Sequence, residues 1–186
     1  MKRIVIFASG SGTNAEAIVN YFAQNKDVGV VAVLSNRVDA QVHTRMAKLG
    51  IPTETFSREE WADGEIIITR LRNLEADFVV LAGFLCYIAM PILKAYGRRI
   101  VNIHPSLLPR HGGRGMWGKH VHQAVLDSGD AESGITIHRV TADVDGGEIL
   151  FQAKCPVLAG DTVELLANRV HRLEYEHYPR IIEQLL

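Results

Sequence analysis

The strongest constraint on the fold is the alternation of short apolar segments with segments of helical periodicity in the N-terminal half of the chain. The apolar segments are unbroken runs rich in Val, Ile and Leu, which is typical of parallel strands buried on both faces. Predicted strands are Arg3–Ala8, Val28–Ser35, Phe78–Ala82 and Arg99–Asn102, and predicted helices are Ala15–Gln24, Ala40–Leu49, Glu65–Glu75 and Pro91–Tyr96. This order predicts an α/β fold with a Rossmann-like, mostly parallel twisted sheet and helices on both faces.

The alternation loosens after residue 118, so the C-terminal part is expected to be mixed or antiparallel. A helix is predicted at Lys119–Ser128, strands at Ile135–Val140 and Glu148–Pro156, and a long helix from Thr162 to about Leu185. Pro179 is expected to kink or split this last helix. Because there is no repeat, low-complexity tract or long linker, residues 1–186 are predicted to form a single domain.

The net charge and the cysteine content limit the classes of partner and the cellular compartment that are expected. The formal net charge is −1 and the pI about 6.7, so nucleic acid and anionic membranes are not expected partners. The two cysteines, Cys86 and Cys155, form neither a disulfide framework nor a metal knuckle, which suits a reducing cytoplasm. The first apolar run, Ile4–Ala8, is too short for a signal peptide or a membrane span.

A glycine-rich turn, ASGSGTN, directly follows the first predicted strand. Gly10 and Gly12 permit a tight backbone, and Thr13 or Asn14 can cap the next helix. Such turns direct backbone amides and the positive helix end at a phosphate, although a turn that merely packs is the alternative.

Two nucleotide-binding motifs do not fit this turn. A Walker A loop needs Gly-Lys-Ser/Thr, whereas Thr13 and Asn14 follow Gly12 here. A dinucleotide site needs an acidic residue at the end of the second strand, which instead ends VLSNR. NAD binding is therefore not expected.

The segment NIHPSLLPR ends the fourth predicted strand with polar side chains. Asn102 and His104 lie two residues apart and should share one side of the strand, near the carboxyl edge where α/β sheets bind ligands. Pro105 and Pro109 direct the chain out of the sheet. An amide and an imidazole are suited to oxyanion stabilisation and acid catalysis, but a capped strand end with a hydrogen-bonded histidine is the simpler alternative.

A partner carboxylate for His104 is available in TADVDGGEI, where Asp145 precedes two glycines. An EF-hand is excluded, because Lys154 stands eleven positions after Asp143 where calcium needs Glu. If Asp145 folds against His104, it should favour the imidazolium form and raise the histidine pKa.

NIHPSLLP followed about forty residues later by DVDGG, together with SGSGTN and LAGF, resembles the formyltransferases that use 10-formyltetrahydrofolate. The glycine turn resembles the branch that acts on glycinamide ribonucleotide in purine biosynthesis. The resemblance runs from ASGSGTN to HRLEYEHYP, nearly the whole chain. It implies direct attack of the ribonucleotide amine on the formyl carbon. Asn102 and protonated His104 would stabilise the oxyanion, Asp145 would keep His104 charged, and no metal is implied.

The resemblance also implies binding residues. The ribonucleotide would be held by Gly12, Thr13, Asn14, His171 and Glu174. The folate would lie along Arg58, Leu85, Cys86, Tyr87, Ile88, Asn102, Thr141, Ala142, Asp143 and Val144. Two features depart from the family: Cys86 stands where an arginine is frequent, and HGGRGMWGKHVHQA is longer than expected, so that Arg114, Trp117 and His120 are not placed.

Other functions remain alternatives. A zinc hydrolase could use some of the eight histidines, but His120 and His122 should point to divergent faces of a helix, and no HExxH is present. A nucleotide sensor would need only the glycine turn. A formyltetrahydrofolate hydrolase or a methionyl-tRNA formyltransferase would normally carry a further domain, for which this chain has no room. Glu174, judged without the resemblance, is expected to be a solvated charge, and a monomer or weak homodimer is predicted.

Overall fold

The computed structural model describes all residues, 1–186, which form two compact units. The N-terminal unit comprises residues 1–102 with Leu186, and the C-terminal unit comprises residues 103–185. The prediction of one domain over the whole chain is not tested by this division and stays a prediction.

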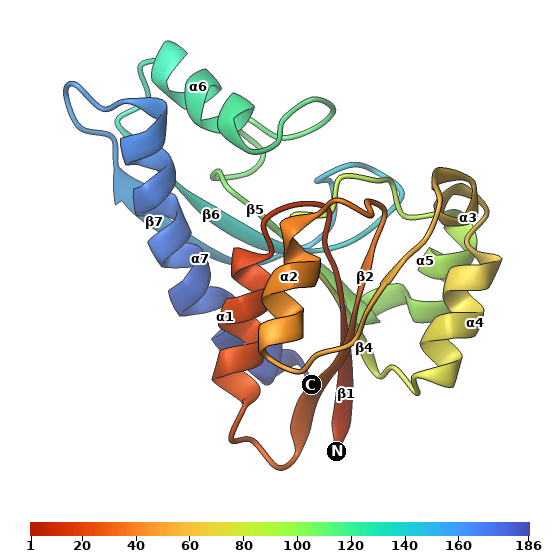
Figure 1. Cartoon of the computed structure of the whole chain (residues 1–186). Helices are drawn as coiled ribbons and strands as arrows, with labels where there is room; N and C mark the ends of the chain where they lie inside the picture. The colour runs from red at the N-terminus through yellow and green to blue at the C-terminus, as the bar shows by residue number, and fades with distance from the viewer. The chain divides into compact units, whose positions relative to one another are not determined.

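The N-terminal unit is built on a parallel sheet (Figure 1). Its strands lie in the order β3-β2-β1-β4-β5, so the chain starts in the middle of the sheet and extends it on both sides. The bounds are β1 Lys2–Phe7, β2 Val28–Ser35, β3 Thr53–Thr55, β4 Phe78–Leu81 and β5 Ile100–His104, the last crossing into the C-terminal unit. All four strands predicted in this half are confirmed, with β5 extending two residues beyond its predicted end at Asn102.

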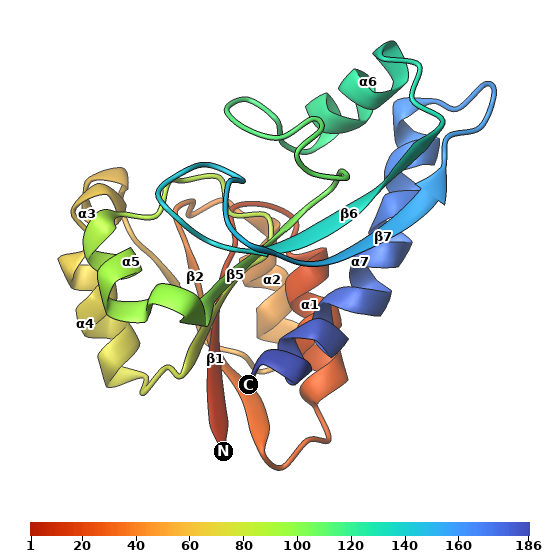
Figure 2. The same cartoon turned by 180° about the vertical axis from the view of Figure 1, so that it is seen from behind.

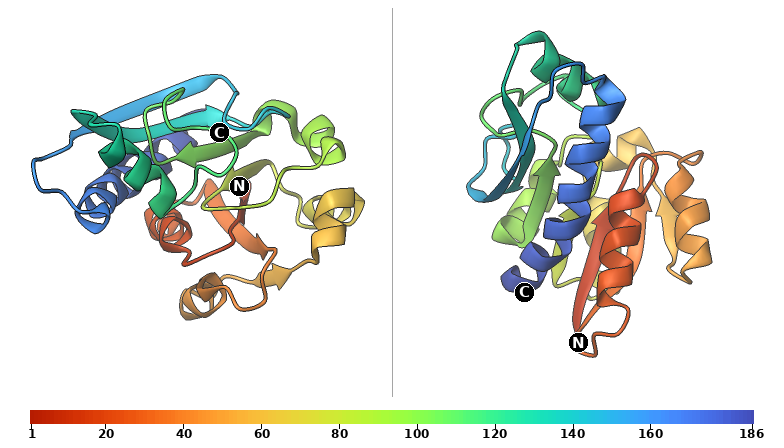
Figure 3. Two further views of the ribbon diagram at one scale, coloured as in Figure 1. Left: turned by 90° about the horizontal axis from the view of Figure 1, so that it is seen from above. Right: turned by 90° about the vertical axis from the view of Figure 1, so that its left-hand side faces the viewer.

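Helices cover both faces of this sheet. α1 and α2 lie on one side of the strands and α4 and α5 on the other (Figure 3, left). The bounds are α1 Thr13–Phe22, α2 Gln41–Lys48, α3 Arg58–Asp63, α4 Glu65–Asn73, α5 Met90–Tyr96 and a 3₁₀ turn, η1, at Gly97–Arg99. The predicted α/β class is therefore confirmed. β3 and α3 were not predicted, because a three-residue Thr-Glu-Thr strand and a six-residue helix are too short for a periodic pattern.

The core of the N-terminal unit explains why the apolar segments are continuous. In β1 the residues from Ile4 to Phe7 are all fully buried, as expected for a strand covered on both faces. Trp61 on α3 packs edge-on to Phe7 at 4.8 Å between ring centroids, and its indole N–H donates to the Ser35 carbonyl at 3.3 Å. A capping box between Ser57 and Glu60 starts α3 and thereby positions this tryptophan.

The C-terminal unit contains an antiparallel pair of strands and two helices (Figure 2). The bounds are α6 Lys119–Asp127, β6 Glu132–Arg139, β7 Ile149–Pro156 and α7 Val163–Leu185. α7 packs against both strands and against α6. The expected antiparallel C-terminal part is therefore confirmed. Gly134 allows the strands to approach, because a Cβ there would lie 2.0 Å from the Ala153 carbonyl oxygen.

α7 continues through Pro179 without a break, so of the two expectations for this residue the split is wrong, and the kink stays a prediction. Proline cannot donate the backbone hydrogen bond of its position, which weakens the helix locally. Residues on either side of it, Val170, Tyr178 and Ile182, are fully buried, and their packing outweighs the lost bond.

No helix of the chain combines the length and the apolar character that crossing a membrane requires.

Candidate active site

The glycine turn of the N-terminal unit has the backbone geometry that its sequence predicts. Gly12 has φ +74° and is the N-cap of α1, and a Cβ at this position would lie 2.5 Å from Cγ2 of Val42. The Gly10 carbonyl accepts from the Val42 N–H at 3.1 Å, and the Ser11 carbonyl accepts from Arg45 Nε at 2.9 Å. Residues of α2 therefore stabilise the backbone of the glycine turn.

The expected capping by Thr13 or Asn14 is wrong. α1 begins at Thr13, and no side chain caps it. The first intrahelical bond runs from Glu16 N–H to the Gly12 carbonyl at 2.9 Å, so the amides of the first turn have no acceptor within the helix. A left-handed glycine followed by such amides and the positive helix end is suited to an anion.

Ser9, two residues after the end of β1, connects the predicted folate segment to the sheet by hydrogen bonds. Its hydroxyl donates to Asn36 Oδ1 at 2.6 Å and accepts from the Leu85 N–H at 2.8 Å. Leu85 and Tyr87 are 49% and 64% exposed, an unusual state for large apolar side chains next to a buried strand. This fixed, exposed segment offers apolar contact to a ligand.

Arg58 influences Cys86 electrostatically, and both residues belong to the N-terminal unit. Burial raises the pKa of the Cys86 thiol, and the positive charge of Arg58 opposes that rise. Arg58 is exposed at the first position of α3. The structure therefore brings these two predicted folate residues into one neighbourhood.

In the C-terminal unit His104 meets Asp145, as the sequence predicts. His104 Nδ1 lies 3.5 Å from Asp145 Oδ2, and the His104 residue is 4% exposed. Asp145 has φ +54°, a strained backbone for a residue with a side chain, next to two glycines. His138 of β6 lies on the other carboxylate oxygen, with Nε2 3.6 Å from Oδ1. Asp145 is thus flanked by two histidines.

The pKa values of this pair differ from the expectation. Burial lowers the pKa of His104 and outweighs the Asp145 carboxylate, which does act to raise it. The expected net rise is therefore wrong, because the imidazole is almost fully removed from water. Burial acts to raise the pKa of Asp145, but the hydrogen bond from His138 and the charge of His104 bring it below its usual value.

Residues 111–113 also contact the pair, which the sequence did not indicate. The His111 carbonyl lies 2.8 Å from His104 Nε2, and the Gly113 N–H donates to Asp145 Oδ2 at 2.9 Å. His111 Nε2 in turn lies 2.7 Å from Asp130 Oδ2. No sequence motif signals these contacts, because two of them use backbone atoms.

Glu174 of α7 is 5% exposed, so the expectation of a solvated charge is wrong. A buried carboxylate needs polar partners, and its helical position alone did not reveal its burial. Burial raises the pKa of Tyr178, and the neighbouring Glu174 charge adds to the rise.

His171, three residues before Glu174, is half-buried and lies near His122 of α6, with 6.4 Å between ring centroids. Burial lowers the pKa of His171, and burial together with His171 lowers the pKa of His122 to about 4. His122 is buried and His120 exposed, so their predicted divergence on α6 is confirmed. No three His, Cys, Asp or Glu side chains are grouped as a metal site would require.

The remaining predicted folate residues, Thr141–Val144, are exposed in the loop that leads to Asp145. The Thr141 hydroxyl donates to the Asp143 carbonyl at 3.2 Å, and the Gly146 N–H donates to the same carbonyl at 3.1 Å. These bonds shape the loop whose end presents Asp145 to His104.

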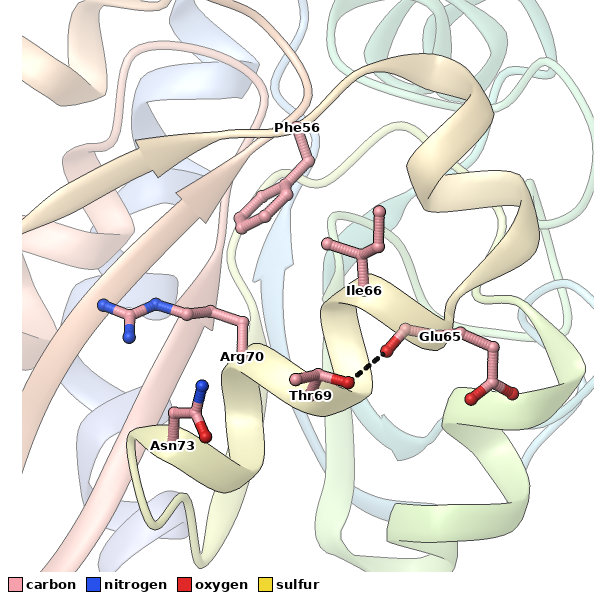
Figure 4. A pocket seen from close by; sticks show the side chains of 6 residues that line it. All are labelled: Phe56, Glu65, Ile66, Thr69, Arg70 and Asn73. Atoms are coloured by element: carbon pink, nitrogen blue, oxygen red, sulfur yellow. Dashed lines mark hydrogen bonds between the residues drawn. The ribbon is translucent and has the colours of Figure 1, made fainter.

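A hollow of about 340 Å³ lies elsewhere, on α4 of the N-terminal unit (Figure 4). It is lined by Phe56, Glu65, Ile66, Thr69, Arg70 and Asn73. The Thr69 hydroxyl donates to the Glu65 carbonyl at 3.0 Å within the helix. None of the predicted site residues lines this hollow.

A parallel sheet with a glycine turn after β1 and a buried imidazole–carboxylate pair at the end of β5 is the arrangement of an α/β enzyme. A protein-family model described as formyl transferase matches residues 2–182. The chain therefore belongs to the formyl transferase family, and the predicted enzyme class is confirmed.

Relatives with known names agree with this family. Phosphoribosylglycinamide formyltransferase of Escherichia coli K12 is 40% identical over 185 residues, covering 96% of this chain and 84% of that protein. The protein of the same name from Bacillus subtilis is 36% identical, covering 100% and 95%. The trifunctional purine biosynthetic protein adenosine-3 of Drosophila melanogaster is 36% identical, but the chain spans only 14% of its length.

Solved structures show the same fold. Glycinamide ribonucleotide transformylase 1 from Symbiobacterium toebii superposes with a TM-score of 0.90 at 37% identity, covering 98% of this chain and 86% of that one. Phosphoribosylglycinamide formyltransferase from Streptococcus pneumoniae TIGR4 gives 0.88 at 35% identity, covering 100% and 99%.

Proposed function

We propose that the protein transfers the formyl group of 10-formyltetrahydrofolate to the primary amine of glycinamide ribonucleotide, a step of purine biosynthesis. The observation that carries this proposal is the 3.5 Å contact between His104 and Asp145 in a member of the formyl transferase family. The named activity of the relatives supports the same acceptor.

The chemistry follows from the groups at the end of β5. The amine attacks the formyl carbon, and negative charge develops on the formyl oxygen. Asn102 and His104 share a side of the strand, so the amide donates to this oxygen. The N–H at His104 Nε2 donates to it as well, shared with the His111 carbonyl that lies 2.8 Å away. One such preorganised donor is typically worth roughly 3–4 kcal/mol in the transition state.

The lowered pKa of His104 gives this imidazole a specific role. With no substrate bound, burial favours the neutral ring. Once negative charge develops on the formyl oxygen, that charge restores the proton affinity of the ring. Asp145 orients the ring and stabilises the imidazolium, and it accepts, through water, the proton that the attacking amine loses. The oxyanion then collapses to the carbonyl of the new formamide, the carbon–nitrogen bond to the folate breaks, and the released folate nitrogen takes up the proton that Asp145 accepted.

Binding is assigned to two sets of residues. Gly12, Thr13 and Asn14 hold the ribonucleotide phosphate, because the left-handed glycine and the helix start favour an anion. The buried Glu174 carboxylate, with His171, accepts hydrogen bonds from the ribose or glycinamide part.

The folate pterin is assigned to the backbone of residues 85–88 and the exposed side chains of Leu85 and Tyr87. Asn102 and residues 141–144 are assigned as its further contacts. Arg58 meets the glutamate tail as a cation. Cys86 offers no charge at the position where the family often has arginine, so recognition of the pterin there relies on the backbone.

The deciding experiment mixes the protein with 10-formyltetrahydrofolate and records the deformylated folate spectrally, with and without glycinamide ribonucleotide. We expect release only when the ribonucleotide is present. Equal release without it would identify a hydrolase, and binding of the ribonucleotide without any release would identify a nucleotide sensor. A location in the cytoplasm, and a monomeric or weakly dimeric state, belong to the same proposal.

A further inference from the structure

We propose that Asp130 is a positioning residue for the reaction, because it holds His111 and thereby fixes residues 111–113 against His104 and Asp145. This inference rests on the proposed function, which assigns catalysis to the pair. It concerns only residues of the C-terminal unit, and we call residues 111–113 the clamp.

The clamp contacts both members of the pair through its backbone. The His111 carbonyl lies 2.8 Å from His104 Nε2, and the Gly113 N–H donates at 2.9 Å to Asp145 Oδ2, the oxygen that faces His104 Nδ1. One short segment therefore fixes the plane of the imidazole and the orientation of the carboxylate at the same time. No helix or strand fixes the backbone of Asp145, since this residue lies in a loop.

The clamp does not hold this shape by itself. His111 has φ +53° and Gly113 φ +92°, both in the left-handed region. For a residue with a side chain this backbone is strained, so His111 needs a stabilising contact elsewhere. Gly112 is close to its surroundings, since a Cβ there would lie 2.5 Å from Cδ2 of Leu108 and 3.5 Å from Cβ of Asp145.

Asp130 supplies that contact. Its Oδ2 lies 2.7 Å from His111 Nε2, and Arg110 forms an ion pair with its other oxygen. The Asp130 side chain is only 6% exposed, and the hydrogen bond from His111 brings the pKa of this carboxyl below its usual value. Because Asp130 lies between α6 and β6, its backbone is anchored by regular structure on both sides.

The residue before the clamp, Arg110, is held by hydrogen bonds of its own. The Ser106 hydroxyl donates to the Arg110 carbonyl at 2.7 Å, and the Arg110 N–H donates to the Leu107 carbonyl at 3.1 Å. The side chain of His111 is therefore the link that carries the position of Asp130 to the carbonyl beside His104.

The first test compares four variants in the full-length protein. Asp130→Ala and His111→Leu remove the link, whereas His111→Gln keeps an amide donor near the place of Nε2. Asp161→Ala is the matched control, because Asp161 is also nearly buried, at 3% exposure, and pairs with Arg169 in the same unit.

We expect kcat to fall roughly 10- to 100-fold in Asp130→Ala and His111→Leu, because a displacement of about 1 Å in a reacting group has effects of this size. The KM values of both substrates should change less than about threefold, since positioning acts on the transition state. His111→Gln should retain most of the turnover, and Asp161→Ala should match the wild type. Turnover within about twofold of wild type in Asp130→Ala would overturn the inference.

The second readout does not need activity. The ring nitrogens of His104, recorded by NMR across a pH titration, should change in chemical shift and midpoint in Asp130→Ala and not in Asp161→Ala. A drop in kcat with an unaltered His104 titration would mean a merely structural role and would also overturn the inference. If the wild type transfers no formyl group, the proposed function fails, while the titration still tests the clamp.

Discussion

The glycine turn after β1 and the His104–Asp145 region solve the problem of positioning polar groups in different ways. The turn uses backbone atoms of neighbouring residues, fixed by the left-handed Gly12 and supported by Val42. The His104 region uses side chains from β5, β6 and the loop at Asp145, held by the clamp. The turn is formed by backbone atoms of consecutive residues, whereas the His104 region is assembled over long sequence distances from side chains of acids and histidines.

This difference implies that the His104 region is sensitive to single charges. Changing Asp145→Asn keeps the size of the side chain but removes the charge that flanks His104 and His138. We expect turnover to fall at least about a hundredfold, because the imidazole loses its orienting partner. Steady-state kinetics should show nearly unchanged KM for the ribonucleotide. Turnover close to wild type would show that Asp145 has no part in the reaction.

The stability of the C-terminal unit should also depend on pH, through the buried His122 of α6. The pKa of His122 is about 4 in the folded protein against an ordinary value of 6.5, so the unfolded chain binds its proton first as the pH falls. The free energy of unfolding contributed by His122 is therefore complete above pH 6.5 and is lost between about 6.5 and 4. The loss is roughly 3 kcal/mol, at about 1.4 kcal/mol for each pKa unit.

The measurement is urea unfolding at several pH values in this range. Burial also lowers the pKa of His104 and His171, so their contributions have the same sign. His122→Gln, which does not titrate, should have a visibly shallower dependence than the wild type. Parallel curves for the two proteins would contradict the lowered pKa.

The glycine turn can be tested by a substitution that changes its backbone conformation. Gly12→Ala places a Cβ 2.5 Å from Val42 in a left-handed conformation, so we expect a loss of about 1–3 kcal/mol in stability. Because the amides after Gly12 shift with it, KM for the ribonucleotide should rise more than kcat falls. Gly10→Ala is the control for stability, since no atom lies within 4 Å of its Cβ position. Equal stability of the two variants would remove the special role of Gly12.

The sequence was sufficient to predict the strands and most helices, because a strand that is buried on both faces has a continuous run of apolar residues. It was also sufficient for the contact of His104 with Asp145, through the motifs that resemble the family. It did not reveal the clamp, because a carbonyl and an N–H have no signature among side chains. Asp130 was equally hidden, since an acidic residue after a helix is ordinary turn chemistry.

Two errors have the same physical origin. Glu174 was expected in solvent because helical spacing alone does not tell which side of a polar stripe is covered, and it is 5% exposed. His104 was expected to have a raised pKa because the sequence supplied the charge of its partner but not the extent of its burial.

The order of strands and helices, the glycine turn and the candidate catalytic side chains could be inferred from the sequence, since they depend on neighbouring residues and on residue type. The depth at which each charge is buried, and the backbone atoms around it, became known only from the folded chain. Desolvation and hydrogen bonding depend on every group within a few ångströms, and residues far apart in the sequence supply those groups.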